Sequence, residues 1–269
     1  VRILASDAGM QPYRFTKQDE EREKKWKIYK NILEKYSDFC HKELVLEKHE
    51  EVSKYLNERK ISKKEINFFK IGYAPADNQF YDQLRKEFDE NQIISSGIYY
   101  LDNYKKKYVD RFRGRIIFPV KSLNGAIFAL GGRTFLSKNT FAKYINSPET
   151  QIFRKGNLLF NLDKARRHID ENKRFLLVEG QLDAIRCWEQ GVKNVVAPQG
   201  TAFTSGQAHL LRRYLPAGID CLLDGDEAGQ KAALRILPIC VKSALDIRFL
   251  LLPPGGDPDD LLRSEGLAG

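Results

Sequence analysis

The chain has 269 residues, 42% of them hydrophobic, and its 45 Lys and Arg against 36 Asp and Glu give a formal net charge of +9. This length is enough for a substantial core in one or two domains. The sequence has no apolar run of about 18 residues, no secretory signal and no C-x-x-C pair among its four cysteines, so we expect an intracellular, soluble protein without zinc or disulfides.

Helices are expected first in chain order, followed by short strands. Apolar residues at helical spacing and a capping box from Ser62 to Glu65 predict several amphipathic helices. These helices are predicted at 19–50 (one or two), 52–59, from 62 onward and at 80–90. After residue 97 the pattern changes to short apolar runs separated by turns. The main strands are predicted at 98–101, 115–120 and 126–133.

From residue 174 onward, apolar strands alternate with helices. The strands are predicted at 175–178, 194–197, 219–223 and 247–252, with helices at 182–190, at 207–214 and from about 228. Short alternation of this kind implies a mainly parallel sheet with helices on both faces. We therefore expect an α/β unit at 173–269, preceded by an α+β unit at 1–172.

The positive charge is concentrated in residues 101–170. This stretch has fifteen Lys and Arg against five Asp and Glu, so it accounts for the whole excess of the chain. Such a basic block attracts polyanions, including the nucleic-acid backbone. A solvated lysine-rich surface is the alternative interpretation.

Carboxylates follow two of the predicted parallel strands. Glu179 closes the first strand of the α/β unit, and Asp224 and Asp226 close the third. Acids at the carboxyl ends of parallel strands face a shared crevice. Clustered carboxylates repel one another and retain protons unless a cation neutralises them, and Mg²⁺ prefers such hard oxygen ligands. These residues predict metal-dependent phosphoryl chemistry.

Further acids lie close to these strand ends in sequence. Asp183 comes four residues after Glu179, where it either lines the same rim or only favours the helix N-terminus. The segment Asp257-Pro-Asp259-Asp260 follows the last predicted strand. Its acids are expected in the first turn of a final helix, where capping and metal binding are both possible roles.

The order of these motifs resembles a known family. Glu179-Gly180 followed by Asp224-x-Asp226 within short α/β alternation resembles the TOPRIM domain shared by topoisomerases, primases and some nucleases. The upstream segments resemble the catalytic core of DnaG-type bacterial primases. These segments are Tyr55-Leu-x-x-Arg59, Ile71-Gly-Tyr-Ala-Pro75, Asp110-Arg-Phe-Arg-Gly-Arg-Ile-Ile-Phe-Pro119, Gly131-Gly-Arg133, Lys143-Tyr-Ile-Asn-Ser-Pro-Glu-Thr150 and Phe153-Arg-Lys-Gly156.

The resemblance implies a TOPRIM-type unit after a basic α+β subdomain, and an activity in DNA replication. The expected enzyme is a DNA-directed RNA polymerase that makes short RNA primers on a single-stranded DNA template from ribonucleoside triphosphates, in the cytoplasm at the replication fork. The family's amino-terminal zinc-binding domain and carboxy-terminal helicase-binding region have no counterpart here. We therefore expect an isolated core or a truncated form, with the replicative helicase a partner of the full-length family.

The resemblance also implies roles for individual residues. The principal acids, expected to be catalytic and to bind two or more Mg²⁺ or Mn²⁺ ions, are Glu179, Asp224 and Asp226, and the accessory metal ligands are Asp183, Asp257 and Asp259. The basic residues expected to bind template or nucleotide are Arg133, Lys143 and Lys155 in a groove, and Arg59, Arg111 and Arg113 on its flank.

Two other interpretations remain open at the level of sequence. A TOPRIM nuclease or topoisomerase would use the same acids to cleave DNA, although a topoisomerase also needs a nucleophilic tyrosine on a separate DNA-gripping domain. A non-catalytic module for single-stranded DNA would need the basic block but not the acids. Binding that is equally strong in EDTA would favour the second of these interpretations.

Overall fold

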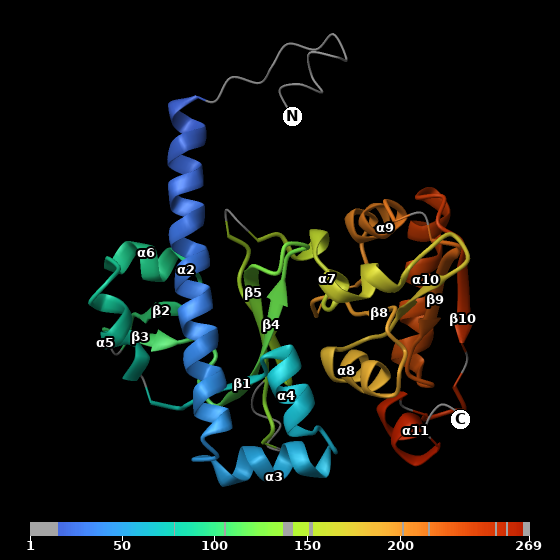
Figure 1. Cartoon of the computed structure of the whole chain (residues 1–269), viewed down its shortest axis with the longest axis horizontal. Helices are drawn as coiled ribbons and strands as arrows, with labels where there is room; N and C mark the ends of the chain where they lie inside the picture. Colours follow the sequence, from blue (N-terminus) through green and yellow to red (C-terminus); the bar gives the residue numbers. More distant parts are fainter. Residues whose placement is uncertain are drawn as a thin grey trace.

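The computed structural model describes residues 16–265, apart from 78, 105, 137–141, 151–152, 201, 215, 251 and 257. Within this part of the chain, no helix has both the length and the apolar character needed to cross a membrane. Figure 1 shows a small lobe around β2 and β3, a central antiparallel sheet and a second sheet flanked by helices. One long helix, α2, projects beyond the rest of the molecule.

The helix α2 (Lys17–Val45) is a single element where the sequence predicts one or two. Thr16 caps its N-terminus reciprocally with Asp19. Its buried side chains include Tyr29, Ile32 and Tyr36, which recur at helical spacing on one face. The helix packs on the central sheet so closely that a Cβ atom on Gly72 would lie 2.6 Å from the backbone carbonyl carbon of Cys40.

Four shorter helices follow, and one prediction among them is corrected. The helices are α3 (Glu50–Glu58), α4 (Lys63–Phe69), α5 (Gln79–Arg85) and α6 (Glu90–Ser95). The single helix predicted at 80–90 is instead the pair α5 and α6. Asp89 starts a new helix at this point because its carboxylate accepts a hydrogen bond from Gln92 N at 2.8 Å, and the Gln92 side chain caps in return.

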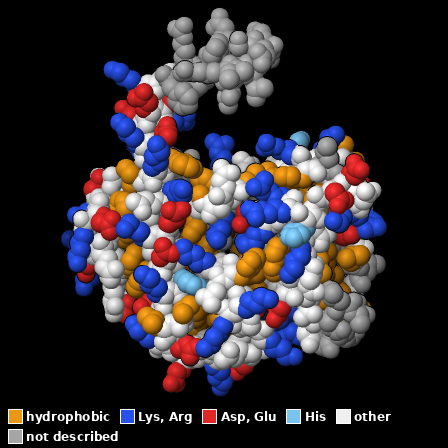
Figure 2. Space-filling model, in the orientation of Figure 1, with side chains coloured by type: hydrophobic (Ala, Val, Ile, Leu, Met, Phe, Trp, Pro, Cys, Tyr) orange, Lys and Arg blue, Asp and Glu red, His pale blue; other side chains and the backbone are white. Residues whose placement is uncertain are grey.

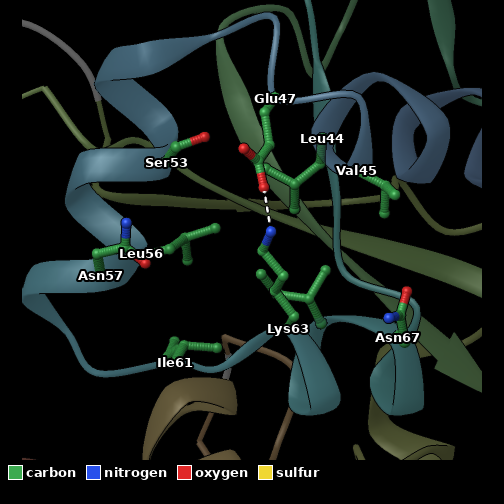
Figure 3. A pocket seen from close by; sticks show the side chains of 10 residues that line it. Leu44, Val45, Glu47, Ser53, Leu56, Asn57, Ile61, Lys63 and Asn67 are labelled. Atoms are coloured by element: carbon green, nitrogen blue, oxygen red, sulfur yellow. Dashed lines mark ion pairs between the residues drawn. The ribbon is translucent and has the colours of Figure 1, made fainter.

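A cavity of about 340 Å³ lies between the end of α2, α3 and α4. Figure 3 shows apolar side chains of Leu44 and Leu56 within it and an ion pair between Glu47 and Lys63 across it. The two charged groups are 2.5 Å apart. Glu47 ends the α2 segment in the left-handed region, with φ of 54°. The chain therefore reverses direction beside a pocket with both apolar and polar lining residues.

The central sheet is antiparallel with the order β1-β4-β5-β6. Its strands are β1 (Gly72–Ala74), β4 (Arg115–Lys121), β5 (Ile127–Arg133) and β6 (Tyr144–Asn146), and a separate hairpin pairs β2 (Tyr99–Asp102) with β3 (Lys107–Asp110). The predictions for β2, β4 and β5 are confirmed. The strands β1 and β6 were not predicted, because three residues are too few to show an alternating pattern.

The second sheet is parallel with the order β10-β9-β7-β8, as the alternation of elements predicts. Its strands are β7 (Arg174–Leu177), β8 (Val195–Val196), β9 (Gly218–Leu222) and β10 (Ile247–Leu250). The accompanying helices are α7 (Leu162–Ala165), α8 (Gln181–Glu189), α9 (Ser205–Arg212), α10 (Glu227–Lys242) and α11 (Pro258–Glu265), with 3₁₀ turns at Lys155–Asn157 and Arg166–His168.

Alternate residues of β7 enter two different cores. Phe175 and Leu177 belong to the apolar cluster that contains side chains of α9 and α10. Leu176 and Val178 belong to the cluster that contains side chains of α8, together with Phe118 of the central sheet. Because successive strand residues point to opposite faces, this division confirms helices on both faces of the sheet. The second cluster also joins the two halves of the chain.

The Asp110 carboxylate is buried in the small lobe, with 3% of the residue exposed. Tyr36 donates its hydroxyl proton toward both carboxylate oxygens, at 2.9 and 2.7 Å, and Phe112 N donates at 2.6 Å. Burial raises the pKa of Asp110 to about 6, although these hydrogen bonds oppose the shift. The folded state therefore holds this proton more tightly than the unfolded chain does.

This raised pKa predicts a specific pH dependence of stability. The contribution of Asp110 is complete below its unfolded pKa, near 3.8, and is lost as pH rises through about 6. Relative to Asp110→Asn, which does not titrate, the wild-type free energy of unfolding should fall by about 2–3 kcal/mol between about pH 4 and pH 7. Urea unfolding of both proteins across this range measures the difference, and parallel pH profiles would contradict the expectation.

Candidate active site at the carboxyl ends of the parallel strands

The carboxyl ends of β7 and β9 lie side by side because these strands pair in parallel. Glu179 follows β7, and its Oε1 accepts a hydrogen bond from Asp224 N, which follows β9, at 3.3 Å. Glu179 is exposed, so its carboxylate is accessible to solvent or a ligand. The structure thus brings together two acids that are 45 residues apart in the chain.

The turn after β9 is fixed by close backbone packing. Asp226 caps α10, and its Oδ1 accepts a hydrogen bond from Gly229 N at 2.7 Å. A Cβ atom on Gly229 would lie 2.0 Å from Asp224 O, so a side chain at this position would displace the Asp224 backbone. Glycine at 229 therefore helps to set where the Asp224 and Asp226 side chains begin.

The loop after β10 is attached to the same turn. Gly225 N donates to Gly256 O, and Gly255 N donates to Gly225 O, each at 2.8 Å. Asp257 comes directly after this loop in sequence but lies outside the described residues. The two hydrogen bonds bring Gly255 and Gly256 to the turn that carries Asp224 and Asp226.

The site is built of hard oxygen donors. Glu179 and Asp224 supply carboxylates from neighbouring strand ends, which suits Mg²⁺ or Mn²⁺ better than a metal that prefers sulfur ligands. In the described part of the chain, no three His, Cys, Asp or Glu side chains lie close enough together to hold an ion. The acids of this region are therefore adjacent in the structure without forming a closed ligand cage.

A second cluster joins the central sheet to the start of α8. Arg133, at the end of β5, donates from Nη1 to the Tyr144 hydroxyl at 2.5 Å, and its guanidinium lies over the Tyr144 and Tyr55 rings. Burial raises the pKa of Tyr144, and the nearby charge of Asp183 contributes to the increase. The Oδ2 atom of Asp183 accepts from Gly180 N at 2.9 Å.

Arg133 has unused hydrogen-bonding capacity at this cluster. Only 6% of the residue is exposed, and its Nε is buried without a hydrogen-bond partner in the part of the chain that the structure describes. A buried donor of this kind is costly unless something satisfies it. An anionic group that reaches Arg133 would satisfy the donor.

Asp259, predicted to bind a metal, lies in a buried cluster of arginines. Its Oδ1 accepts from Arg186 Nε at 2.9 Å and its Oδ2 from Arg59 Nη1 at 2.7 Å, and Arg263 Nε is 3.6 Å away. Burial alone would raise the pKa of Asp259, but the hydrogen bonds from Arg186 and Arg59 and the charges of Arg186 and Arg263 outweigh it and hold the pKa below its usual value. The structure therefore pairs Asp259 with Arg59, which the sequence assigns to the nucleic-acid flank.

The other predicted basic residues lie in three places. Arg111 donates to Gly97 O at 2.8 Å and Arg113 to Asp110 O at 2.9 Å, which ties both to the small lobe. Lys143 is exposed directly before β6, next to Tyr144 in sequence. Lys155 begins the 3₁₀ turn before α7 and is half-buried.

The sequence analysis did not identify two residues of these clusters as members of the site. Tyr144 falls within the Lys143–Thr150 segment that carries the family resemblance, but an isolated tyrosine gives no signal of its own. Arg186 is 4% exposed. The signal for it in the sequence is a charged residue among the apolar residues of α8. A charged residue on a buried helix face indicates a partner but does not identify it.

Comparison with known proteins gives a family match for each half of the chain. Residues 39–166 match the family model described as DNA primase catalytic core, N-terminal domain, and residues 176–262 match the Toprim-like model. The DNA primase of Aquifex aeolicus is 35% identical over 237 residues, which are 87% of this chain and 46% of that protein. The DNA primase of Salmonella typhimurium is 34% identical over 256 residues, 92% of this chain and 43% of that protein. The chain thus spans less than half the length of these relatives.

Solved structures agree with this placement. The chain superposes on a structure of the zinc-binding and RNA polymerase domains of Aquifex aeolicus primase with a TM-score of 0.81 and 32% identity, covering 98% of this chain and 63% of that one. For a DNA primase domain from Pseudomonas aeruginosa the TM-score is 0.80 with 33% identity, covering 88% and 75%. For a DnaG primase catalytic domain bound to ssDNA the TM-score is 0.79 with 31% identity, covering 91% and 77%.

Proposed function

The chain belongs to the DnaG-type bacterial primases, and from this membership we propose that it is the catalytic core of a DNA primase. The core joins ribonucleoside triphosphates into short RNA primers on a single-stranded DNA template. The observation that carries the proposal is the position of Glu179 against the Asp224 turn, at the shared carboxyl edge of β7 and β9. Acids at this edge of a parallel sheet are positioned to act on a substrate in the crevice.

The family is generally metal-dependent, and two or more Mg²⁺ or Mn²⁺ ions are proposed here. The residues that would hold them are Glu179, Asp224 and Asp226, with Asp183 and Asp257 as accessory ligands. Such ions neutralise the carboxylates and stabilise negative charge on the attacking and leaving oxygens of a transferred phosphoryl group. Asp259 has a different role in this proposal, since both of its oxygens are engaged by arginines.

The protein itself positions the substrates, because phosphoryl transfer needs little covalent chemistry from side chains. Arg133 is proposed to bind the triphosphate, since its buried Nε lacks a partner among the described residues and the Tyr144 hydroxyl orients its guanidinium. Lys143 and Lys155 are proposed to attract the template backbone. Arg111 and Arg113 extend the positive charge toward the small lobe, where their guanidinium groups also bind backbone carbonyls.

The two halves of the chain divide this work in the proposal. Residues 1–172 supply most of the groups that bind nucleic acid or nucleotide, and residues 173–269 supply the acids. The contact between Arg133, Tyr144 and the first turn of α8 lies where the halves meet. An apolar cluster with side chains from both halves supports this division, because it packs the halves against each other.

Incubation with single-stranded DNA, ribonucleotides and either Mg²⁺ or Mn²⁺ tests the function directly. We expect labelled oligoribonucleotides whose synthesis stops when EDTA removes the ion. Template cleavage without new RNA would indicate the nuclease alternative. DNA binding that is unchanged in EDTA, without synthesis under either ion, would indicate a non-catalytic binding module.

A further inference from the structure

Two glutamine side chains form a buried amide pair beside the acidic site. Gln181, the first residue of α8, donates a hydrogen bond from Nε2 to Gln199 Oε1 at 3.1 Å. Gln181 is 2% exposed, and no part of Gln199 is exposed. Gln199 follows β8, which pairs in parallel with β7. The amide pair therefore connects the carboxyl ends of two neighbouring strands.

Both glutamines also contact the central sheet. A Cβ atom on Gly131 of β5 would lie 2.7 Å from Gln181 Nε2, so the amide packs directly against the β5 backbone. Asn146 of β6, which pairs with Gly131, donates from Nδ2 to the backbone oxygen of Gln199 at 3.1 Å. A Cβ atom on Gly200 would overlap the same Asn146 amide. The amide pair thus lies where the parallel sheet meets the central sheet.

This contact lies between the two groups that the proposed function places on opposite sides of the triphosphate. Glu179 comes two residues before Gln181, and Arg133 comes two residues after Gly131. Gly131 and Arg133 are alternate residues of one strand, so they face the same side of the central sheet. A shift of the Gln181 amide along or away from β5 would therefore change the position of Glu179 relative to Arg133.

The amide pair does not give the greatest stability available at this junction. Figure 2 shows Lys and Arg side chains on the surface between the central sheet and the helices of the second half, whereas the two amides are buried. Gln199 Nε2 has no hydrogen-bond partner in the part of the chain that the structure describes. A buried unpaired donor costs folding free energy, while apolar side chains of similar shape at both positions cost little or nothing. Polar groups kept in this way are characteristic of functional sites.

We infer that Gln181 and Gln199 are positioning residues for nucleotidyl transfer, which hold Glu179 at a fixed separation and orientation from Arg133. The hydrogen bond between the two amides keeps Gln181 against β5 and so fixes the first turn of α8. A displacement of about 1 Å between groups that act on one substrate costs about 10²-fold in rate. The inference rests on the proposed function, which assigns Glu179 to the metal ions and Arg133 to the triphosphate.

The double variant Gln181→Met with Gln199→Met separates positioning from stability. It keeps the length of both side chains and removes the donor and the acceptor together, so the urea midpoint should stay at or above that of wild type. The kcat of primer synthesis should fall about 10- to 100-fold, while affinity for single-stranded DNA stays within about twofold. Gln190→Met at the other end of α8 is the matched control and should change neither quantity. Loss of folding in the double variant would mean that the pair serves stability and would overturn the inference.

A second variant displaces the Gln181 amide without removing it. The Cβ atom that Gly131→Ala adds would lie 2.7 Å from Gln181 Nε2, and the flexible end of that side chain has to move away. We expect kcat to fall about 10-fold in this variant. In a Gln181→Ala background there is no amide to displace, so Gly131→Ala should then change kcat by less than about twofold. The same loss of kcat in both backgrounds would contradict the inference.

The affinity for Mn²⁺ provides a measurement that needs no primer synthesis. Free Mn²⁺ is followed by electron paramagnetic resonance during titration of wild type and of the double methionine variant. The variant should bind the ion about 10-fold more weakly, the lower end of the range for residues that orient metal ligands.

The possible results separate this inference from the proposed function. If wild type makes primers and the double variant makes them at the same kcat, the inference is overturned and the function stands. If wild type makes no primers but the double variant binds Mn²⁺ more weakly, the positioning role is supported and the proposed function is contradicted. Absence of primers together with unchanged Mn²⁺ affinity would contradict both.

Discussion

Replacement of Glu179 by Gln should reduce primer synthesis about a thousandfold while the affinity for single-stranded DNA stays within about twofold of wild type. The amide has nearly the same shape as the carboxylate and can still accept the hydrogen bond from Asp224 N. It lacks the negative charge through which the carboxylate holds a divalent cation strongly. Losing a metal ligand, or a group that assists deprotonation, removes about 10²- to 10⁴-fold in rate.

The measurement is the rate of labelled RNA formation under saturating template and nucleotide, with DNA binding followed separately. Glu171→Gln is a matched control, since Glu171 is exposed in the loop before the amino-terminal end of β7, the opposite end of the strand from Glu179. That variant should retain wild-type synthesis. Full activity in Glu179→Gln would refute the assignment of Glu179 to the catalytic site.

Replacement of Asp259 by Ala should lower the free energy of unfolding by about 3–5 kcal/mol. The Asp259 and Arg186 side chains are each only 4% exposed, and removing the carboxylate leaves the buried Nε of Arg186 without its acceptor, while Glu189 still pairs with Nη1. Primer synthesis should also fall, because Asp259 links α11 to α8 and lies two residues after Asp257. Urea unfolding gives the stability, and the double variant with Arg186→Leu and Asp259→Leu should recover part of it.

The pH dependence distinguishes an ion pair from a simple packing effect at Asp259. Its pKa in the folded state is below the ordinary value of 3.8, so its stabilising contribution is complete above that value and is lost as pH falls through the folded pKa. The stability difference between wild type and Asp259→Asn should therefore be constant near neutral pH and shrink in acid below about pH 4. A difference that stays constant in acid would mean that charge does not contribute.

The architecture of the second half can be predicted from the sequence, because each element is indicated by a pattern within a few consecutive residues. Apolar runs of four or five residues that alternate with helices identify β7, β9 and β10, and their crossovers imply parallel pairing. The correction at α5 and α6 has an equally local cause, the capping pair Asp89 and Gln92. The short strands β1 and β6 form only because β4 and β5 offer backbone partners.

Part of the candidate site can be predicted from the sequence for the same reason. Glu179 and Asp224 each end a strand, and parallel pairing of those strands brings them together without further information. The partners of Arg133 and Asp259 follow no such rule. Arg59 and Asp259 are 200 residues apart in the chain, and no periodicity or spacing connects them.

The sequence by itself determined the parallel sheet, the acids at its carboxyl edge and the family, since these depend on strand order and on short motifs. Only the tertiary structure decided that Asp259 pairs with Arg186 and Arg59, and that Arg133 pairs with Tyr144. The physical reason is that local backbone preferences act over a few residues. The partner of a buried charge or an aromatic ring depends on how whole elements pack.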